Sequence, residues 1–331
     1  MSSDHDSDHH ACHCGHAHAD GAKHIYIYSP SSAVRDKAAF RRGVKRLQKL
    51  GYEVEIDVDA LASHTRFAGD DATRLAAIHR AAASGADVAL ISRGGYGLTR
   101  ILPGIDYAAV ASAIDGGMRF VGVSDFTAFQ NAVLAQAGAV TWAGPALCPD
   151  FGTQELPDDI MEACFDDLIF GFGEGTGWRL PREKLAAGAL PALPLELEVG
   201  EGRLWGGNLA VLASLVGTPY LPQVPGGILF IEDVNEHPYR VERLLTQLLY
   251  AGVLAQQKAV IFGQFNGYTL AAHDKGFKLQ SVVDWLRRQI SAPVLTHLPY
   301  GHVETKVCLP VGAPVQLSVA GRDAMLYWGH L

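Results

Sequence analysis

The 331-residue chain lacks the features that mark membrane and secreted proteins. No window approaches the roughly 20 consecutive apolar residues that a membrane-spanning helix needs. The N-terminus also lacks a cationic stretch followed by an apolar one, which a secretory signal would have. We therefore expect a cytoplasmic protein with no membrane partner.

Positive charge and cysteine are also scarce. The formal net charge is -8, and no basic arm stands out, so the counterion release that drives nucleic-acid binding has no source here. The odd number of cysteines and their scatter exclude a disulfide framework or a zinc knuckle and predict reduced thiols. The five are Cys12, Cys14, Cys148, Cys164 and Cys308.

The composition that is present suits a folded α/β protein. Hydrophobic residues make up 48% of the chain and charged residues 19%, and the length exceeds what one core usually organises. Short apolar runs alternate with amphipathic stretches, which predicts strands separated by helices. We expect two lobes: an open, mostly parallel α/β sheet over 24–172 and an α/β domain over 195–331. A Gly-, Pro- and Ala-rich linker over 173–194 would join them.

The first 24 residues hold seven of the 14 histidines and two of the cysteines. Imidazole and thiolate bind Zn, Ni or Cu, but the segment has no apolar residues with which to pack. We expect a disordered His-rich tail over 1–23 whose metal affinity is incidental. A metal-storage or metal-sensing tail is the alternative.

Two strand ends are candidates for chemistry, because open α/β sheets bind ligands outside the carboxyl ends of their strands. The expected strands of the first lobe are 25–28, 54–58, 88–92 and 120–123, with helices over 34–50 and 72–83. Those of the second are 195–199, 227–231 and 259–262; a glycine-rich turn follows the first of these, and helices begin at Asn208 and Tyr239. The strand over 88–92 ends in a glycine cluster, and the strand over 120–123 ends in Ser124.

Ser124 stands on a predicted sharp turn between a strand and a helix. Its hydroxyl would be exposed, and free backbone N–H groups at the helix start would lie behind it, as acyl transfer requires. Serine is also among the best helix N-caps, and Phe126 stands where a G-x-S-x-G elbow has its second glycine. The turn alone leaves both interpretations open.

Six short motifs then decide the matter together. In chain order they are S-R-G-G-Y-G at 92–97, G-V-S-D at 122–125, G-P at 144–145, G-G-N-L at 206–209, L-F-I-E-D at 229–233 and L-P-Y-G-H at 298–302. Each is weak evidence by itself, but in this order they resemble the LD-carboxypeptidase family. The resemblance covers about residues 24–331.

The resemblance implies a serine triad in the cleft between the lobes. Ser124 would be the nucleophile, His302 the general base and Glu232 the carboxylate that orients His302. Asp233 and Glu236 are rivals that the residues alone do not separate from Glu232. The triad needs no metal and no organic cofactor.

A glycine cluster beside the nucleophile suits an oxyanion hole, which needs backbone N–H donors. The N–H groups of Gly95 and Asp125 are our candidates; the alternatives for the glycines are a phosphate-binding or a plain tight turn, but Walker and G-x-G-x-x-G patterns are absent. Tyr96 and Asn208 are candidates for substrate binding. Other aromatic and basic side chains could bind substrate, but core packing and salt bridges are the preferred interpretations for them. They are Trp178, Trp205, Trp328, Arg93, Arg100 and Arg240.

The family resemblance implies hydrolysis of an amide between an L-configured centre and a terminal D-amino acid. Its usual form is release of D-alanine from murein tetrapeptide in cytoplasmic wall recycling, so the expected partner is a small peptide. Immunity peptidases that cleave microcin C-type peptidyl nucleotides are the runner-up within the family. A two-lobed binding or metal-handling protein is the alternative of another class. The family often forms homodimers.

Overall fold

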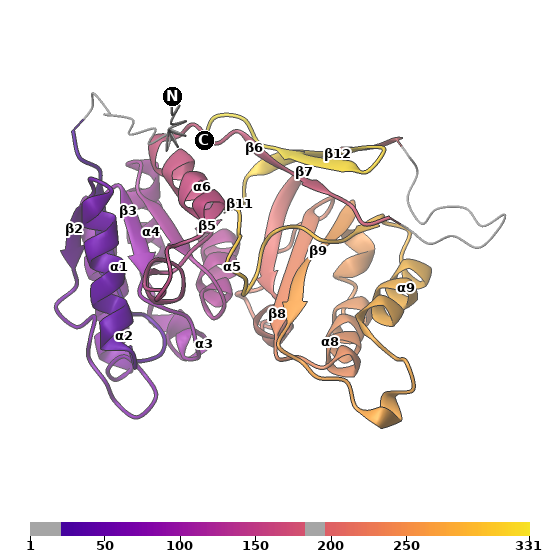
Figure 1. Ribbon diagram of the computed structural model, residues 1–331, viewed down its shortest axis with the longest axis horizontal. Helices are drawn as coiled ribbons and strands as arrows, with labels where there is room; N and C mark the ends of the chain where they lie inside the picture. The colour runs from indigo at the N-terminus through magenta and orange to yellow at the C-terminus, as the bar shows by residue number, and fades with distance from the viewer. Residues whose placement is uncertain (1–20, 183–195) are drawn as a thin grey trace, which may run out of the picture.

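Two α/β halves lie side by side in the computed structural model, which describes residues 21–182 and 196–331 (Figure 1). Each half is built round one sheet, with six strands in the first and seven in the second among the described residues. The α/β fold class and the two-part architecture predicted from the sequence are confirmed.

The first sheet has the strand order β11-β5-β4-β3-β1-β2. Its strands are β1 (His24–Tyr28), β2 (Glu53–Ile56), β3 (Val88–Ile91), β4 (Arg119–Gly122), β5 (Thr141–Ala143) and β11 (Leu309–Val311). All neighbours pair in parallel except β11, which comes from near the end of the chain and runs antiparallel to β5. The second half therefore contributes an edge strand to the first sheet.

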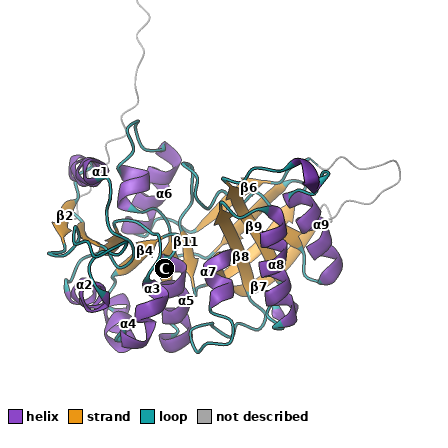
Figure 2. Cartoon of the chain, turned by 90° about the horizontal axis from the view of Figure 1, so that it is seen from below, coloured by secondary structure: helices purple, strands orange, loops and turns teal. Residues whose placement is uncertain are grey.

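Helices cover both faces of this sheet (Figure 2). One face carries α1 (Lys37–Lys49) and α6 (Asp159–Phe170), and the other carries α2 (Asp71–Ala83), α4 (Tyr107–Asp115) and α5 (Phe126–Ala137). The shorter pieces are α3 (Leu98–Ile101), η1 (Leu102–Gly104) and η2 (Leu147–Phe151). Side chains alternate across a strand, so Ile25 and Ile27 of β1 pack with α1, whereas Tyr26 and Tyr28 pack with α2.

The second sheet has the order β10-β9-β8-β7-β12-β13-β6. Its strands are β6 (Gly175–Arg179), β7 (Glu196–Asn208), β8 (Ile228–Val234), β9 (Ala259–Asn266), β10 (Val294–Leu295), β12 (Pro314–Ala320) and β13 (Asp323–Tyr327). Pairing is parallel from β10 to β7 and antiparallel from β7 to β6. The helical segments are α7 (Leu209–Ser214), α8 (Pro238–Tyr250), η3 (Leu254–Gln256), η4 (Ala272–Asp274) and α9 (Leu279–Gln289).

Strand β7 corrects the expected glycine-rich turn after Val199. The strand continues from Glu196 to Asn208, and its register against β12 shifts beside Gly200, whose φ is 73°. A β-bulge of this kind accommodates one extra residue with a positive φ, so the glycine bends the strand without ending it. The two ends of β7 therefore belong to one element, which carries Asn208 at its tip.

The expected linker over 173–194 also contains a strand. β6 pairs with β13, and its residue Trp178 is buried and donates from Nε1 to the carbonyl of Thr296 at 3.0 Å. The buried indole explains why this Gly-rich stretch joins the sheet. Residues 183–195 and residues 1–20 of the His-rich tail lie outside the described residues.

Helix α5 lies where the two halves meet (Figure 1). Every residue from Phe126 to Leu134 is buried, because α5 packs against the first sheet on one side and against α7 and β7 on the other. A helix buried on all sides needs no polar face. The element that follows Ser124 is thus shared by both cores.

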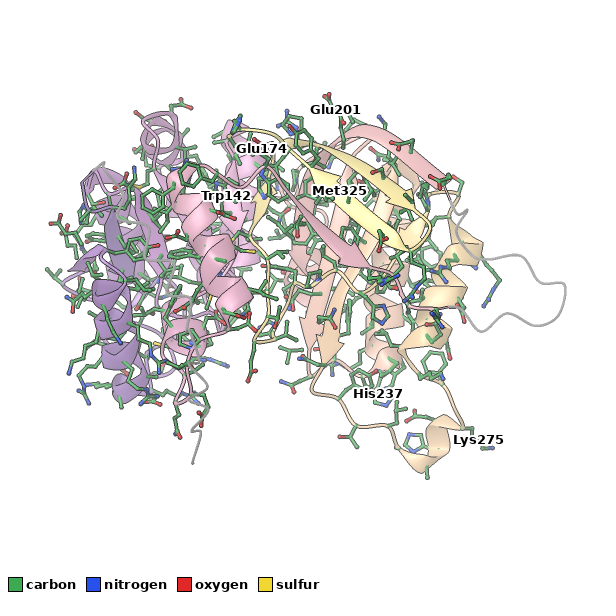
Figure 3. The ribbon with its side chains drawn as sticks, turned by 45° about the horizontal axis from the view of Figure 1, so that its top comes forward. Trp142, Glu174, Glu201, His237, Lys275 and Met325 are labelled. Atoms are coloured by element: carbon green, nitrogen blue, oxygen red, sulfur yellow. The ribbon has the colours of Figure 1, made fainter. Side chains whose placement is uncertain are left out.

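The two ends of the second half differ in character (Figure 3). Glu201 and Met325 mark the antiparallel end, and His237 and Lys275 mark the end to which the carboxyl termini of β8 and β9 point. Among the described residues, Cys148, Cys164 and Cys308 are free thiols. No helix in the same ranges is both long and apolar enough to cross a bilayer.

Candidate active site

Ser124 occupies a strained turn between β4 and α5. Its φ is 69°, a left-handed conformation that is uncommon for a residue with a side chain. The backbone N–H of Thr127 donates to the carbonyl of Ser124 at 2.9 Å and closes the turn. Asp125, not Ser124, holds the N-cap position of α5, and it makes no side-chain cap hydrogen bond. Helix capping therefore does not account for Ser124.

The glycine cluster after β3 lies directly against this turn. A Cβ atom on Gly94 would lie 2.7 Å from Cβ and 3.0 Å from Oγ of Ser124, so only glycine leaves room for the hydroxyl. Gly95 has a φ of 121°, and a Cβ there would lie 2.2 Å from Oγ of Ser32. The predicted meeting of the two strand ends is seen in the structure.

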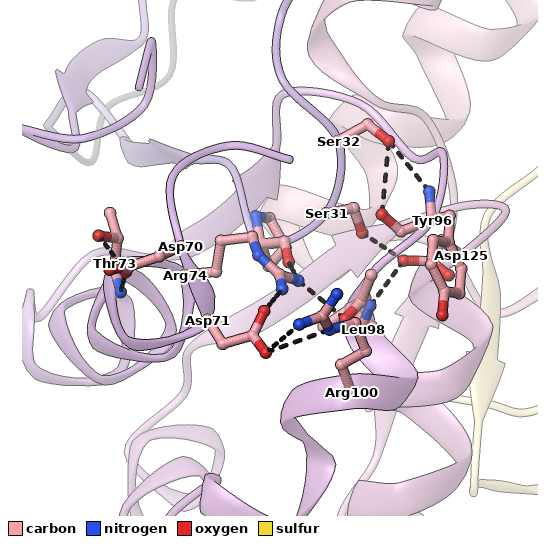
Figure 4. A network of polar contacts seen from close by, with 12 residues as sticks. Ser31, Ser32, Asp70, Asp71, Thr73, Arg74, Tyr96, Leu98, Arg100 and Asp125 are labelled. Carbon is pink, nitrogen blue, oxygen red and sulfur yellow. Dashed lines mark hydrogen bonds and ion pairs between the residues drawn. The ribbon is translucent and has the colours of Figure 1, made fainter. Parts of the chain in front are cut away.

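Asp125 fastens the turn to the glycine cluster (Figure 4). Its buried Oδ2 accepts hydrogen bonds from Oγ of Ser31 at 2.7 Å and from the backbone N–H of Leu98 at 3.0 Å. Burial raises the pKa of this carboxyl, and these hydrogen bonds oppose the rise. Within the described residues, the backbone N–H groups of Gly95 and Asp125 make no hydrogen bond, so both are free to act as donors.

Glu232 and His302 form a hydrogen-bonded pair. Oε2 of Glu232 lies 2.8 Å from Nδ1 of His302, and the carboxylate is fully buried. Glu232 lies within β8, which continues to Val234 instead of ending at residue 231 as the sequence predicted. A Cβ on Gly301 would lie 3.1 Å from Oε2, so this glycine allows the His302 loop to approach the carboxylate.

The pKa of His302 is raised overall. Burial is the largest single effect and lowers the pKa. The hydrogen bond and the negative charge of Glu232 together raise it by more, and Asp233 adds to the rise. Lys306 acts in the opposite direction. The imidazole is thus a stronger base than a free histidine.

The two rival carboxylates have other partners. Asp233 accepts hydrogen bonds from the backbone N–H groups of Ala210 and Val234, at 2.9 and 2.8 Å. Burial and the neighbouring Glu232 raise the pKa of Asp233 to about 6. Glu236 pairs with Arg240. The geometry therefore distinguishes Glu232 from residues that the sequence left as alternatives.

Asn208 links the pair to the Ser124 turn. Its Nδ2 donates to Oε1 of Glu232 at 3.2 Å, and its backbone N–H donates to Oγ1 of Thr127 at 2.9 Å. Thr127 lies in the first turn of α5, three residues after Ser124. A continuous path of hydrogen bonds thus runs from the serine turn to His302. Thr127 was missed in the sequence, where nothing distinguishes it from any other polar residue of a helix.

Ser124 and His302 are not hydrogen-bonded to each other in the described structure. Such contacts are often loose in a free enzyme and tighten when substrate binds. Tyr96 is partly exposed beside the glycines; its ring lies 5.8 Å from that of Phe67, with the Arg66 guanidinium 5.6 Å away. Arg66 thus lies over one face of a ring that is still 43% exposed at the edge of the site.

The other substrate-binding candidates mostly have structural partners. Trp178 and Trp205 are buried in the core. Arg100 and Arg240 form ion pairs, with Asp71 and Glu236 respectively. In residues 21–182 and 196–331, no group of three or more His, Cys, Asp or Glu side chains could hold a metal ion.

Both halves of the chain match models of one protein family. The model of the LD-carboxypeptidase N-terminal domain matches residues 25–144, and that of the C-terminal domain matches residues 201–317. The crystal structure of muramoyltetrapeptide carboxypeptidase from Oxalobacter formigenes is 37% identical, with a TM-score of 0.82 over 93% of this chain and 99% of that one.

Two curated relatives span most of the chain. The probable murein peptide carboxypeptidase of Bacillus subtilis is 29% identical over 86% of this chain and 85% of its own length. The microcin C7 self-immunity protein MccF of Escherichia coli is 27% identical over 90% of this chain and 91% of its own length. Together with the serine turn and the Glu–His pair, these matches show that the chain belongs to the LD-carboxypeptidase family.

Proposed function

We propose that the protein is a serine-type LD-carboxypeptidase that releases D-alanine from murein tetrapeptide in the cytoplasm. The observation that carries the proposal is the pairing of Glu232 with His302, linked through Asn208 and Thr127 to the strained Ser124 turn. The names of the Oxalobacter and Bacillus relatives support a murein peptide as substrate.

The reaction begins with attack of the Ser124 hydroxyl on the carbonyl carbon of the scissile amide. Glu232 accepts from Nδ1 of His302, so Nε2 is the nitrogen left to take the serine proton. The N–H groups of Gly95 and Asp125 would donate to the oxyanion of the tetrahedral intermediate, in which the serine oxygen is bonded to the former carbonyl carbon.

Collapse of that intermediate breaks the amide bond. His302 returns its proton to the departing amino group, which leaves as the free D-amino acid, and the peptide remains esterified to Ser124. A water molecule then gives its proton to His302 and attacks the ester. The second collapse releases the shortened peptide and restores the serine hydroxyl.

The test follows D-alanine release from murein tetrapeptide by the full-length protein, beside Ser124→Ala, with and without chelator. Release by the unsubstituted protein alone, unchanged by chelator, supports a metal-independent serine peptidase. Hydrolysis that persists in Ser124→Ala would overturn the assignment of the nucleophile. Deletion of the His-rich tail over 1–23 is a separate test. It should leave turnover intact under this proposal and abolish function if the protein handles metal.

A peptidyl-nucleotide substrate is the second candidate, because MccF of Escherichia coli matches over 90% of this chain. Absence of D-alanine release from well-folded protein, together with Ser124-dependent cleavage of a peptidyl-nucleotide conjugate, would favour it. The partly exposed ring of Tyr96 is then the first place to look for base stacking.

A further inference from the structure

The loop that carries His302 lies between the two halves and is held by both. On the side of the second half, the Leu298 backbone N–H donates to the carbonyl of Phe262 at 3.1 Å. The Asn266 side-chain amide donates to the carbonyl of His302 at 2.7 Å. These contacts, with Glu232, fix the histidine relative to the second sheet.

On the side of the first half, Thr305 and Lys306 of the loop are the anchors. Oγ1 of Thr305 donates to Oδ2 of Asp158 at 2.5 Å. Nζ of Lys306 lies 2.6 Å from Oδ1 of Asp150, and these two side chains are only 3% and 4% exposed. A buried ion pair therefore joins the His302 loop to the half that carries Ser124.

Asp150 is itself tightly attached to the first sheet. Its Oδ2 accepts from the backbone N–H of Ala146 at 2.7 Å, just beyond the end of β5. β5 pairs in parallel with β4, the strand that leads into Ser124. The carboxylate is thus placed on the framework of the serine turn, 156 residues away from Lys306 in sequence.

A buried ion pair is poorly explained by stability alone. Removing two charges from water is costly, and an apolar pair of similar volume is often as stable or more stable. Burial raises the pKa of Asp150, and the Lys306 ammonium opposes the rise. The pair is therefore a costly feature at a place where the histidine loop meets the serine half.

We propose that the Lys306–Asp150 ion pair is a positioning device, which holds the His302 loop against the first half so that the imidazole can reach Ser124. The inference rests on the proposed serine mechanism. Lys306 and Asp150 act through His302 and touch no reacting atom.

The charge of Lys306 has a second consequence for His302. The charged groups that act on the imidazole are Glu232 and Asp233 of β8, Lys306 of its own loop, and Asp150 of η2. Glu304 of the same loop is exposed. The carboxylates raise the pKa of His302 and Lys306 lowers it, so the lysine keeps more of the histidine in its basic, neutral form near neutral pH.

The decisive variant is Lys306→Met combined with Asp150→Asn. The asparagine oxygen can still accept from Ala146, and no unpaired charge is left buried, so the protein is expected to fold. We expect kcat to fall roughly 10- to 100-fold with KM nearly unchanged, because a misplacement of about 1 Å has effects of this size. The acid limb of the kcat/KM profile should move to higher pH, because Lys306, which lowers the pKa of His302, acts on it more strongly than Asp150, which raises it.

A measurement without substrate separates this inference from the proposed function. The His302 pKa is followed by NMR in protein labelled with ¹³C-histidine, with His302→Gln to assign its signal. We expect the pKa to rise in the double variant even if no substrate has been identified. An unchanged His302 titration together with unchanged kcat in the folded double variant would overturn the inference.

Asp57→Asn provides the matched control. Asp57 is equally buried and pairs with Arg80 at 2.7 Å, but it follows β2 at the opposite edge of the first sheet. The Asp57→Asn variant should have a lower Tm, and the pKa of its His302 should be unchanged. If the double variant does not fold, Thr305→Val removes the partly buried contact to Asp158; wild-type kcat in that variant would count against a positioning role for this side of the loop.

Discussion

Nδ2 of Asn208 lies 3.2 Å from Oε1 of Glu232, while the backbone N–H of the same asparagine donates to Thr127 in the first turn after Ser124. One residue at the tip of β7 therefore contacts both the acid of the proposed triad and the helix of the proposed nucleophile. Its Oδ1 also accepts from the N–H of Val211 and caps α7.

The substitution Asn208→Ser separates these roles. Serine still caps α7, but the hydrogen bonds from the amide to the buried Glu232 and Asp233 are lost, so stability should fall by about 1–3 kcal/mol. We expect kcat for D-alanine release to fall at least about tenfold, because Glu232 loses one of its positioning contacts. Steady-state kinetics and thermal unfolding on the same preparation check both parts. Wild-type kcat in the folded variant would show that Asn208 serves the fold alone.

A single methyl group added at Gly94 should reduce activity strongly, because it would press on Ser124. In Gly94→Ala the new Cβ would lie 2.7 Å from Cβ and 3.0 Å from Oγ of Ser124, against a turn that cannot retreat easily. We expect kcat to fall by about 100-fold or more while the protein remains folded. Gly173→Ala is the control, since its Cβ would meet its nearest neighbour at 3.5 Å, and it should behave as wild type. Full activity in Gly94→Ala would mean that the two strand ends are farther apart in solution.

The residues that the sequence revealed are those that carry chemistry within short motifs. Ser124, Glu232 and His302 each stand in a recognisable run of four to six residues, and strands such as β3 and β8 appear as apolar runs. The alternation of strands and helices was sufficient to predict two α/β parts, although Gly200 was taken for a turn. A glycine in a bulge and a glycine in a turn have the same local signal.

Contacts between distant segments were beyond that reasoning. Asp150 and Lys306 are 156 residues apart, and each looks like an ordinary surface charge in the sequence. The antiparallel β11 joins the first sheet from the end of the chain, and its pairing with β5 depends on how the halves assemble. The residues alone did not separate Glu232 from Asp233, because both follow the same apolar run. The family resemblance favoured Glu232, and the 2.8 Å distance between its Oε2 and Nδ1 of His302 supports that choice.

The backbone of Ser124 predicts a difference between two inactive variants. Its φ of 69° disfavours any residue with a Cβ, by about 1–2 kcal/mol relative to glycine. Ser124→Gly should therefore be more stable to chemical denaturation than Ser124→Ala by roughly 1 kcal/mol. Both should be inactive. Equal stability of the two variants would indicate that the left-handed turn relaxes when the hydroxyl is absent.

The pH profile offers the most direct view of His302. The imidazole must be neutral to accept the serine proton, and its pKa is raised above the usual value of about 6.5, so kcat/KM should rise with pH and reach half of its maximum above pH 6.5. In Glu232→Gln the hydrogen-bonded charge that raises this pKa is gone, whereas burial, which lowers it, remains. The acid limb should therefore move to lower pH while kcat falls by about 10³- to 10⁴-fold. Asp233→Asn, which removes a weaker raising charge, should move the limb in the same direction by less. A limb that stays in place in Glu232→Gln would show that a group other than His302 controls the rise in activity.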